Sequence, residues 1–128
     1  MVSMDITPVF AYGTLKPGEK MFRHINHTVK DTVPAIIPGR LYETPFGYPL
    51  LVGVGLDEEA LVHGVLLIPL QDRYEEMVRI IDVIEREAGF EKGEMEVTLE
   101  SGQRLNAIVY FYREAPTYAR PFCGSDWP

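Results

Sequence analysis

The sequence predicts a small mixed β-barrel of the α+β class. Short apolar runs typical of strands recur along the chain, and glycine- and proline-containing turns separate them. One segment, Asp72 to Glu85, instead has its apolar residues at helical spacing. The 128 residues suit one domain with a real core, and 46% apolar with 24% charged residues is ordinary globular composition. Many short strands with glycine and proline kinks, and one helix between them in the sequence, are typical of such a barrel.

The expected strands before the helix are short apolar runs. They are Val9 to Tyr12, Ala35 to Tyr42, Leu50 to Val54 and Val62 to Ile68. The first run stops at Gly13, and Pro38-Gly39 interrupts the second, which indicates an edge position or a bulge. Gly64 indicates a bend in a curved sheet. Between the first two strands, Glu19 to Ile25 is expected to form a short helix.

The sequence after the helix predicts a β-hairpin followed by a C-terminal tail. Met95 to Leu99 and Leu105 to Tyr112 form a closing pair of strands, and Glu100 to Gln103 is a fair hairpin connection. Ala115 to Pro128 is rich in proline, glycine and aromatic residues, so we expect an extended tail without regular structure. The expected organisation is one domain over residues 1–128, with 114–128 as the tail.

The helix carries the residue that points most directly to function, Glu85. An apolar stripe runs along this helix, formed by Tyr74, Met77, Val78, Ile81 and Ile84. A rotation of about 100° per residue places Glu85 within the stripe, near the helix C-terminus. Burial and the helix dipole both raise the pKa of such a carboxyl group, toward the range useful to a general acid/base. The alternative is that the long side chain turns out to water at a frayed helix end.

The start of the helix also has a recognisable pattern. Asp72 and Glu75 have the spacing of a capping box, in which the two side chains bind the first free N–H groups of a helix. We therefore expect the helix to begin at Asp72.

The charge and the cysteine count limit the classes of function. A net charge of -7 argues against nucleic acid or an anionic membrane as a partner. Cys123 is the only cysteine, so no internal disulfide or zinc-ribbon site can form. His24, His27 and His63 are scattered and are interpreted as solvated or structural residues. No apolar run is long enough to span a bilayer, and no secretion signal begins the sequence, so a cytoplasmic location is expected.

The turn after the first strand is the second candidate feature. Its sequence is Tyr12-Gly13-Thr14-Leu15-Lys16-Pro17-Gly18. A strand that runs into a glycine turn exposes backbone N–H groups, which can form a nest for a carboxylate or an oxyanion. The Thr14 hydroxyl could add a donor, although an ordinary strand-ending turn is the alternative. The second glycine and the Lys-Ser/Thr pair of a phosphate loop are missing.

Four segments in this order resemble the gamma-glutamylcyclotransferase-like family, which includes AIG2-like and gamma-glutamylamine cyclotransferase branches. They are the Tyr12 to Gly18 turn, Gly39-Arg40-Leu41-Tyr42 followed by Gly47-Tyr48-Pro49, the strand Val62 to Val65, and Ile81-Asp82-Val83-Ile84-Glu85. The resemblance runs from about Val9 to Tyr112. It implies a small β-barrel flanked by helices, in agreement with the strand pattern.

The resemblance also implies a reaction. Family enzymes cyclise a γ-glutamyl group to 5-oxoproline and release the attached amine or amino acid, so the expected partner is a small γ-glutamyl compound. Glu85 matches the general acid/base of the family. Tyr12, Gly13, Thr14 and Leu15 match its substrate-binding turn. No metal, cofactor or protein nucleophile is required.

Some positions depart from the family pattern or leave alternatives open. Where many members have Tyr-x-Arg after the glutamate, this chain has Phe90 and Lys92, which changes the rim of the pocket. Tyr110 and Tyr112 are expected in the core, although a hydroxyl from their strand could reach the pocket. The tail aromatics, Tyr118, Phe122 and Trp127, are expected to dock on the barrel or on a second subunit of a homodimer. A non-catalytic ligand-binding module and an assembly unit with a vestigial pocket are the alternative functions.

Overall fold

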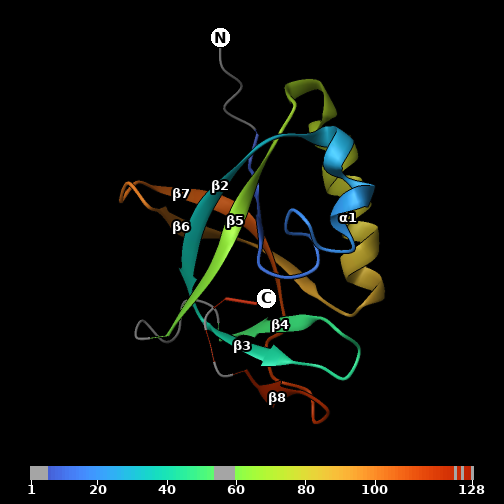
Figure 1. Cartoon of the computed structure of the whole chain (residues 1–128), viewed down its shortest axis with the longest axis vertical. Coiled ribbons are helices and arrows are strands. Elements are labelled where there is room, and N and C mark those ends of the chain that lie inside the picture. The colour runs from blue at the N-terminus through green and yellow to red at the C-terminus, as the bar shows by residue number, and fades with distance from the viewer. Residues whose placement is uncertain (1–5, 54–59, 123, 125, 128) are drawn as a thin grey trace.

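The computed structural model of the protein describes residues 6–53, 60–122, 124, 126 and 127, and contains a closed barrel of five strands. The barrel order is β1-β5-β2-β6-β7. These strands are β1 (Val9–Ala11), β2 (Val29–Pro38), β5 (Leu61–Pro69), β6 (Glu91–Leu99) and β7 (Arg104–Phe111). A second sheet has the order β4-β3-β8, with β3 (Arg40–Glu43), β4 (Pro49–Val52) and β8 (Arg120–Pro121). The helix α1 (Tyr74–Glu87) lies beside the barrel, and the small sheet lies at one end (Figure 1).

The short strand β1 closes the barrel and makes it mixed. It pairs antiparallel with β5, where Phe10 lies opposite Leu66, and parallel with β7, where Val9 lies opposite Ile108. The other ladders are antiparallel, including the long β2–β5 pair and the β6–β7 hairpin. The predicted mixed barrel is therefore confirmed, with α1 and three short 3-10 helices among the described residues.

Alternation along β1 and β7 divides the apolar residues between two cores. Successive side chains of a strand point to opposite faces. Phe10 and Tyr12 belong to the core inside the barrel, together with Val109 of β7. Val9 and Ala11 belong to a second core between the barrel and α1. The second core includes Leu15, Ile25, Met77, Ile81 and Tyr110. The turn after β1 and the helix are thus packed against the same face of the barrel.

The predicted capping box at the start of α1 is wrong. The chain enters α1 through a 3-10 turn (Gln71–Arg73), so Asp72 lies inside a helical turn rather than before it. The N-cap residue is Arg73, and it makes no side-chain capping hydrogen bond.

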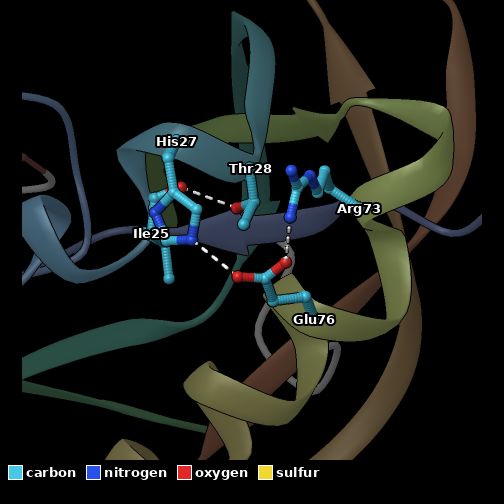
Figure 2. A network of polar contacts seen from close by, with 5 residues as sticks. All are labelled: Ile25, His27, Thr28, Arg73 and Glu76. Atoms are coloured by element: carbon cyan, nitrogen blue, oxygen red, sulfur yellow. Dashed lines mark hydrogen bonds and ion pairs between the residues drawn. The ribbon is translucent and has the colours of Figure 1, made fainter.

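Glu76, in the first turn of α1, joins the helix to a preceding turn. Its carboxylate contacts His27 Nε2 at 2.7 Å and accepts a hydrogen bond from Arg73 Nη1 at 2.9 Å (Figure 2). The hydrogen bond with His27, followed by that with Arg73, lowers the pKa of Glu76.

Two further elements differ from the sequence expectation. Residues 19–25 form turns and the 3-10 helix Phe22–His24 rather than a short α-helix, and a second 3-10 turn follows at Asn26–Thr28. Thr28 is buried and its hydroxyl donates to the carbonyl of Ile25 at 2.6 Å, which holds the segment in tight turns (Figure 2).

The tail also contains regular structure that the sequence did not predict. Arg120–Pro121 adds strand β8 to the edge of β3. Phe122 and Trp127 pack against the core inside the barrel, with their ring centroids 5.2 Å apart. These two rings therefore dock on the chain's own barrel.

Some of the predicted features lie outside the described residues: the beginning of the chain, Val54, Cys123 and Pro128. Within the described part, no helix is both long enough and apolar enough to cross a membrane.

Candidate active site

A cavity of about 410 Å³ lies where the turn after β1, the loop between β3 and β4, and the C-terminal end of α1 meet. Its lining includes all five residues that the sequence assigned to the site. They are Tyr12, Gly13, Thr14, Leu15 and Glu85. The structure therefore brings together two segments that are about 70 residues apart in the chain, as a catalytic reading of the sequence requires.

Glu85 occupies the last turn of α1 and is partly buried. Its backbone is fixed because the N–H groups of Ala88 and Phe90 both donate to its carbonyl, at 3.1 and 3.0 Å. The hydroxyl of Tyr112, the residue after β7, donates to the carbonyl of Ala88, the residue after α1, and so ties the ends of these two elements together. Within the described part of the chain, no cationic side chain forms an ion pair with Glu85. The carboxyl group thus reaches the cavity from a rigid position without a partner that would hold it ionised.

Burial controls the charge of this carboxyl group. Removing the carboxylate from water penalises its ionised form and raises the pKa of Glu85 from 4.5 to about 7. At neutral pH both protonation states are then populated, so one residue can both accept and donate a proton.

The turn after β1 is shaped by close packing. A Cβ atom on Gly13 would lie 2.7 Å from Cγ and 2.8 Å from Cδ of Pro49, so a larger residue would displace one of the two segments. Gly13 does not have a positive φ, which means that space and not backbone conformation demands glycine here. Pro49 begins β4, and both Gly13 and Pro49 line the cavity. The contact between them therefore sets the position of the two segments in the cavity wall.

The turn also leaves backbone donors available. The carbonyl of Gly13 accepts from Lys16 N–H at 3.0 Å, and the carbonyl of Thr14 accepts from Met21 N–H at 2.9 Å. By contrast, the N–H groups of Gly13, Thr14 and Leu15 have no acceptor among the described residues. Adjacent N–H groups of this kind can bind an anion, since they supply partial positive charge without a cationic side chain.

Tyr12 has a clear structural role. Its buried hydroxyl donates to the carbonyl of Tyr110 at 2.6 Å and accepts from the N–H of Leu51 at 3.2 Å. Burial, followed by the nearby Glu85 carboxylate, raises the pKa of Tyr12 well above its ordinary value. The phenol stays protonated and joins β4 to β7 at the cavity wall.

The sequence did not assign Phe46 and Tyr48 to the cavity wall, although it placed Phe90 at the pocket rim and allowed a hydroxyl from the strand of Tyr110 to reach the pocket. Phe46 and Tyr48, from the β3–β4 loop, and Phe90, which follows α1, also line the cavity. Tyr110 lines it from β7, and its hydroxyl donates to Asp82 Oδ1 at 2.5 Å. The signal available for Tyr48 was its place in Gly47-Tyr48-Pro49, whereas nothing in the sequence marked Phe46.

Lys92 does not take the place at the pocket rim that the family arginine would suggest. Its ammonium group pairs with Asp82 at 3.1 Å, and it is absent from the cavity lining. Asp82 therefore accepts from both Lys92 and Tyr110, one helical turn before Glu85. Among the residues that the structure describes, no cluster of histidine, cysteine, aspartate or glutamate could hold a metal ion.

A family model described as "Gamma-glutamyl cyclotransferase, AIG2-like" matches residues 9–128. The chain belongs to the AIG2-like gamma-glutamyl cyclotransferase family. Because the match spans both the turn after β1 and the end of α1, the candidate site lies wholly within the family domain. No curated protein is significantly similar in sequence.

Solved structures support the same fold. YkqA from Bacillus subtilis is 21% identical with a TM-score of 0.70; the match covers 94% of this chain and only 39% of YkqA. An AIG2-like protein from mouse is 20% identical with a TM-score of 0.65, over 88% of this chain and 81% of that protein. A structure titled "Gamma-glutamyl cyclotransferase" is 14% identical with a TM-score of 0.56, over 90% and 70% of the two chains. At these identities the similarity establishes the fold.

Proposed function

We propose that this AIG2-like protein cyclises a γ-glutamyl group to 5-oxoproline and releases the amine that was attached to it. The observation that supports the proposal most strongly is the partly buried Glu85, with its pKa raised to about 7, in the same cavity as the free N–H groups of the turn after β1. An acid/base and an oxyanion site are the two parts that an intramolecular acyl transfer needs from the protein.

The substrate supplies its own nucleophile in this reaction. The α-amino group of the glutamyl unit is an ammonium ion near neutral pH, and ionised Glu85 removes one of its protons. The nitrogen lone pair then attacks the γ-carbonyl carbon, forming a C–N bond and a tetrahedral oxyanion. Protonated Glu85 returns the proton to the departing nitrogen as the original amide C–N bond breaks. The attacking nitrogen still carries two hydrogens, so it passes its second proton to the released amine. The products are 5-oxoproline and the amine as its ammonium ion, and Glu85 is ionised again.

The turn after β1 supports two parts of this sequence. Its N–H groups at Gly13, Thr14 and Leu15 can donate hydrogen bonds to either the substrate α-carboxylate or the developing oxyanion. Anchoring the flexible glutamyl chain in a ring-closing conformation removes much of the entropic cost of the attack. The contact between Gly13 and Pro49 keeps these donors in place.

The test is 5-oxoproline release from a panel of γ-glutamyl amides by the full chain. Wild-type protein is expected to release 5-oxoproline from at least one amide. Glu85→Gln is expected to lower the rate by at least about 100-fold, since general acid–base catalysis contributes about 10² to 10⁴. The matched control is Glu94→Gln, which removes an exposed carboxylate from β6.

The outcomes separate the proposal from its alternatives. Turnover by Glu85→Gln at the wild-type rate would show that the acid/base assignment is wrong. Binding of γ-glutamyl amides by wild-type protein without any 5-oxoproline would favour a ligand-binding module. Absence of both binding and turnover would favour an assembly unit.

A further inference from the structure

Four aromatic side chains form a continuous row from the cavity to the surface. In order they are Phe90, Tyr48, Phe46 and Tyr118, here called the aromatic row. The distances between successive ring centroids are 6.1, 6.0 and 5.2 Å. The first three rings line the same cavity as Glu85. The row therefore leads outward from the site of the proposed chemistry.

The outer end of the row is exposed yet held in place. Phe46 is 57% exposed and Tyr118 is 43% exposed, an unfavourable position for large apolar rings. The Thr44 hydroxyl accepts from the N–H of Phe46 at 3.2 Å and donates to the carbonyl of Tyr48 at 2.8 Å. This bridge closes the β3–β4 loop and presents Phe46 beside the cavity instead of burying it.

Charge in the cavity gives little selectivity between leaving groups. Apart from Glu85, the charged residues in the lining are Lys20 and Glu87, which have opposite signs. A charged leaving group of either sign would therefore meet one attractive and one repulsive side chain. Apolar surface is then the main feature of the wall that can distinguish one amine from another.

We propose that the aromatic row is a subsite for the leaving group, and that the preferred substrates are γ-glutamyl amides of amines that carry an aromatic group. This inference rests on the proposed function. The inner three rings of the aromatic row line the same cavity as Glu85 and the turn after β1, so a leaving group that extends from a glutamyl unit held between those two parts has the row as its apolar wall. A substrate ring packs on the open face of the row and not between Phe46 and Tyr48. Insertion between these two rings would need a separation of about 7 Å, twice the carbon contact distance. Their centroids are only 6.0 Å apart.

The test compares two matched amides, γ-glutamyl-2-phenylethylamide and γ-glutamylethylamide, which differ by one phenyl group. We expect the wild-type full chain to release 5-oxoproline from the phenylethyl compound with a kcat/KM roughly tenfold higher, the size of one to two aromatic contacts. Equal kcat/KM values for the two amides would overturn the proposal.

A pair of variants locates the preference. Phe46→Ser removes the exposed ring of the row and should lower the ratio of the two kcat/KM values to about twofold, since most of the aromatic contact is lost. Val83→Ser is the control, because Val83 is 55% exposed on α1 and does not line the cavity. This control should keep the wild-type ratio. An unchanged ratio in Phe46→Ser would contradict the assignment of the subsite.

Calorimetric binding of the same two amides separates this inference from the proposed function. If neither amide yields 5-oxoproline, the proposed cyclisation fails. The subsite still stands if the phenylethyl compound binds roughly tenfold more tightly and Phe46→Ser removes the difference. Equal dissociation constants, or no binding of either amide, would overturn the subsite as well.

Discussion

Replacing Glu85 by glutamine should stabilise the protein at alkaline pH, even though it removes the proposed acid/base. Burial raises the pKa of Glu85 from 4.5 to about 7. The native state therefore holds a proton that the unfolded state has already lost over this interval. Stability falls as pH rises from about 4.5 to about 7, and the full penalty is present above pH 7.

The magnitude follows from the shift. A rise from 4.5 to about 7 corresponds to about 3 kcal/mol of unfolding free energy, and opening of the cavity to solvent reduces that value. Glutamine is neutral at every pH and keeps the shape of the side chain. We expect Glu85→Gln to match wild type near pH 4.5 and to be about 2 kcal/mol more stable at pH 8.

Urea denaturation of both proteins at pH 4.5 and pH 8 measures this difference directly. Glu94→Gln serves as the control, because Glu94 is exposed on β6 and its replacement should change stability little at either pH. A Glu85→Gln protein whose stability relative to wild type is the same at the two pH values would refute the argument that burial raises the Glu85 pKa.

Two other changes test the support of the cavity. Tyr12→Phe leaves the buried N–H of Leu51 without its acceptor and should lower the unfolding free energy by about 1 to 3 kcal/mol in urea; an unchanged midpoint would contradict the structural role of the hydroxyl. Gly13→Ala places a Cβ 2.7 Å from Pro49 and should lower the rate of 5-oxoproline release by roughly tenfold or more while the circular dichroism spectrum is kept. Wild-type turnover by this variant would show that the turn does not need its observed position.

Local patterns in the sequence were sufficient to predict most of the elements. The spacing of apolar residues shows which face of a strand or helix is buried. This spacing can be read from residues that are close together in the chain. The β6–β7 hairpin is an example, because its strands and the connection from Glu100 to Gln103 are continuous in the chain. At Pro38-Gly39, by contrast, an edge position or a bulge within one strand was predicted, whereas the chain divides there into β2 and β3, which belong to different sheets.

Contacts between segments that are distant in the chain could not be predicted from the sequence. The parallel pairing of Val9 with Ile108, which closes the barrel, leaves no local signal. The predicted capping box failed because the chain enters α1 through the 3-10 turn Gln71–Arg73, which places Asp72 inside a helical turn and makes Arg73 the N-cap residue. Strand β8 forms because β3 offers it an edge, although Arg120-Pro121 alone would not predict a strand.

The site was predictable to the extent that single residues carried the signal. Glu85 could be found because its place in an apolar stripe is visible on a helical wheel, and Gly13 because it ends a strand. Phe46 could not, since the exposure of an aromatic residue in a loop depends on how the loop closes through Thr44. The pairing of Lys92 with Asp82 also required the positions of α1 and β6 relative to each other.

The most direct test of the central claim is the pH dependence of kcat/KM for 5-oxoproline release from a γ-glutamyl amide. This quantity reports the ionisation of groups in the free enzyme and free substrate. We expect kcat/KM to rise with pH through a midpoint near 7, the raised pKa of Glu85. A rising limb at the ordinary carboxyl value of 4.5, or no acidic limb, would contradict it.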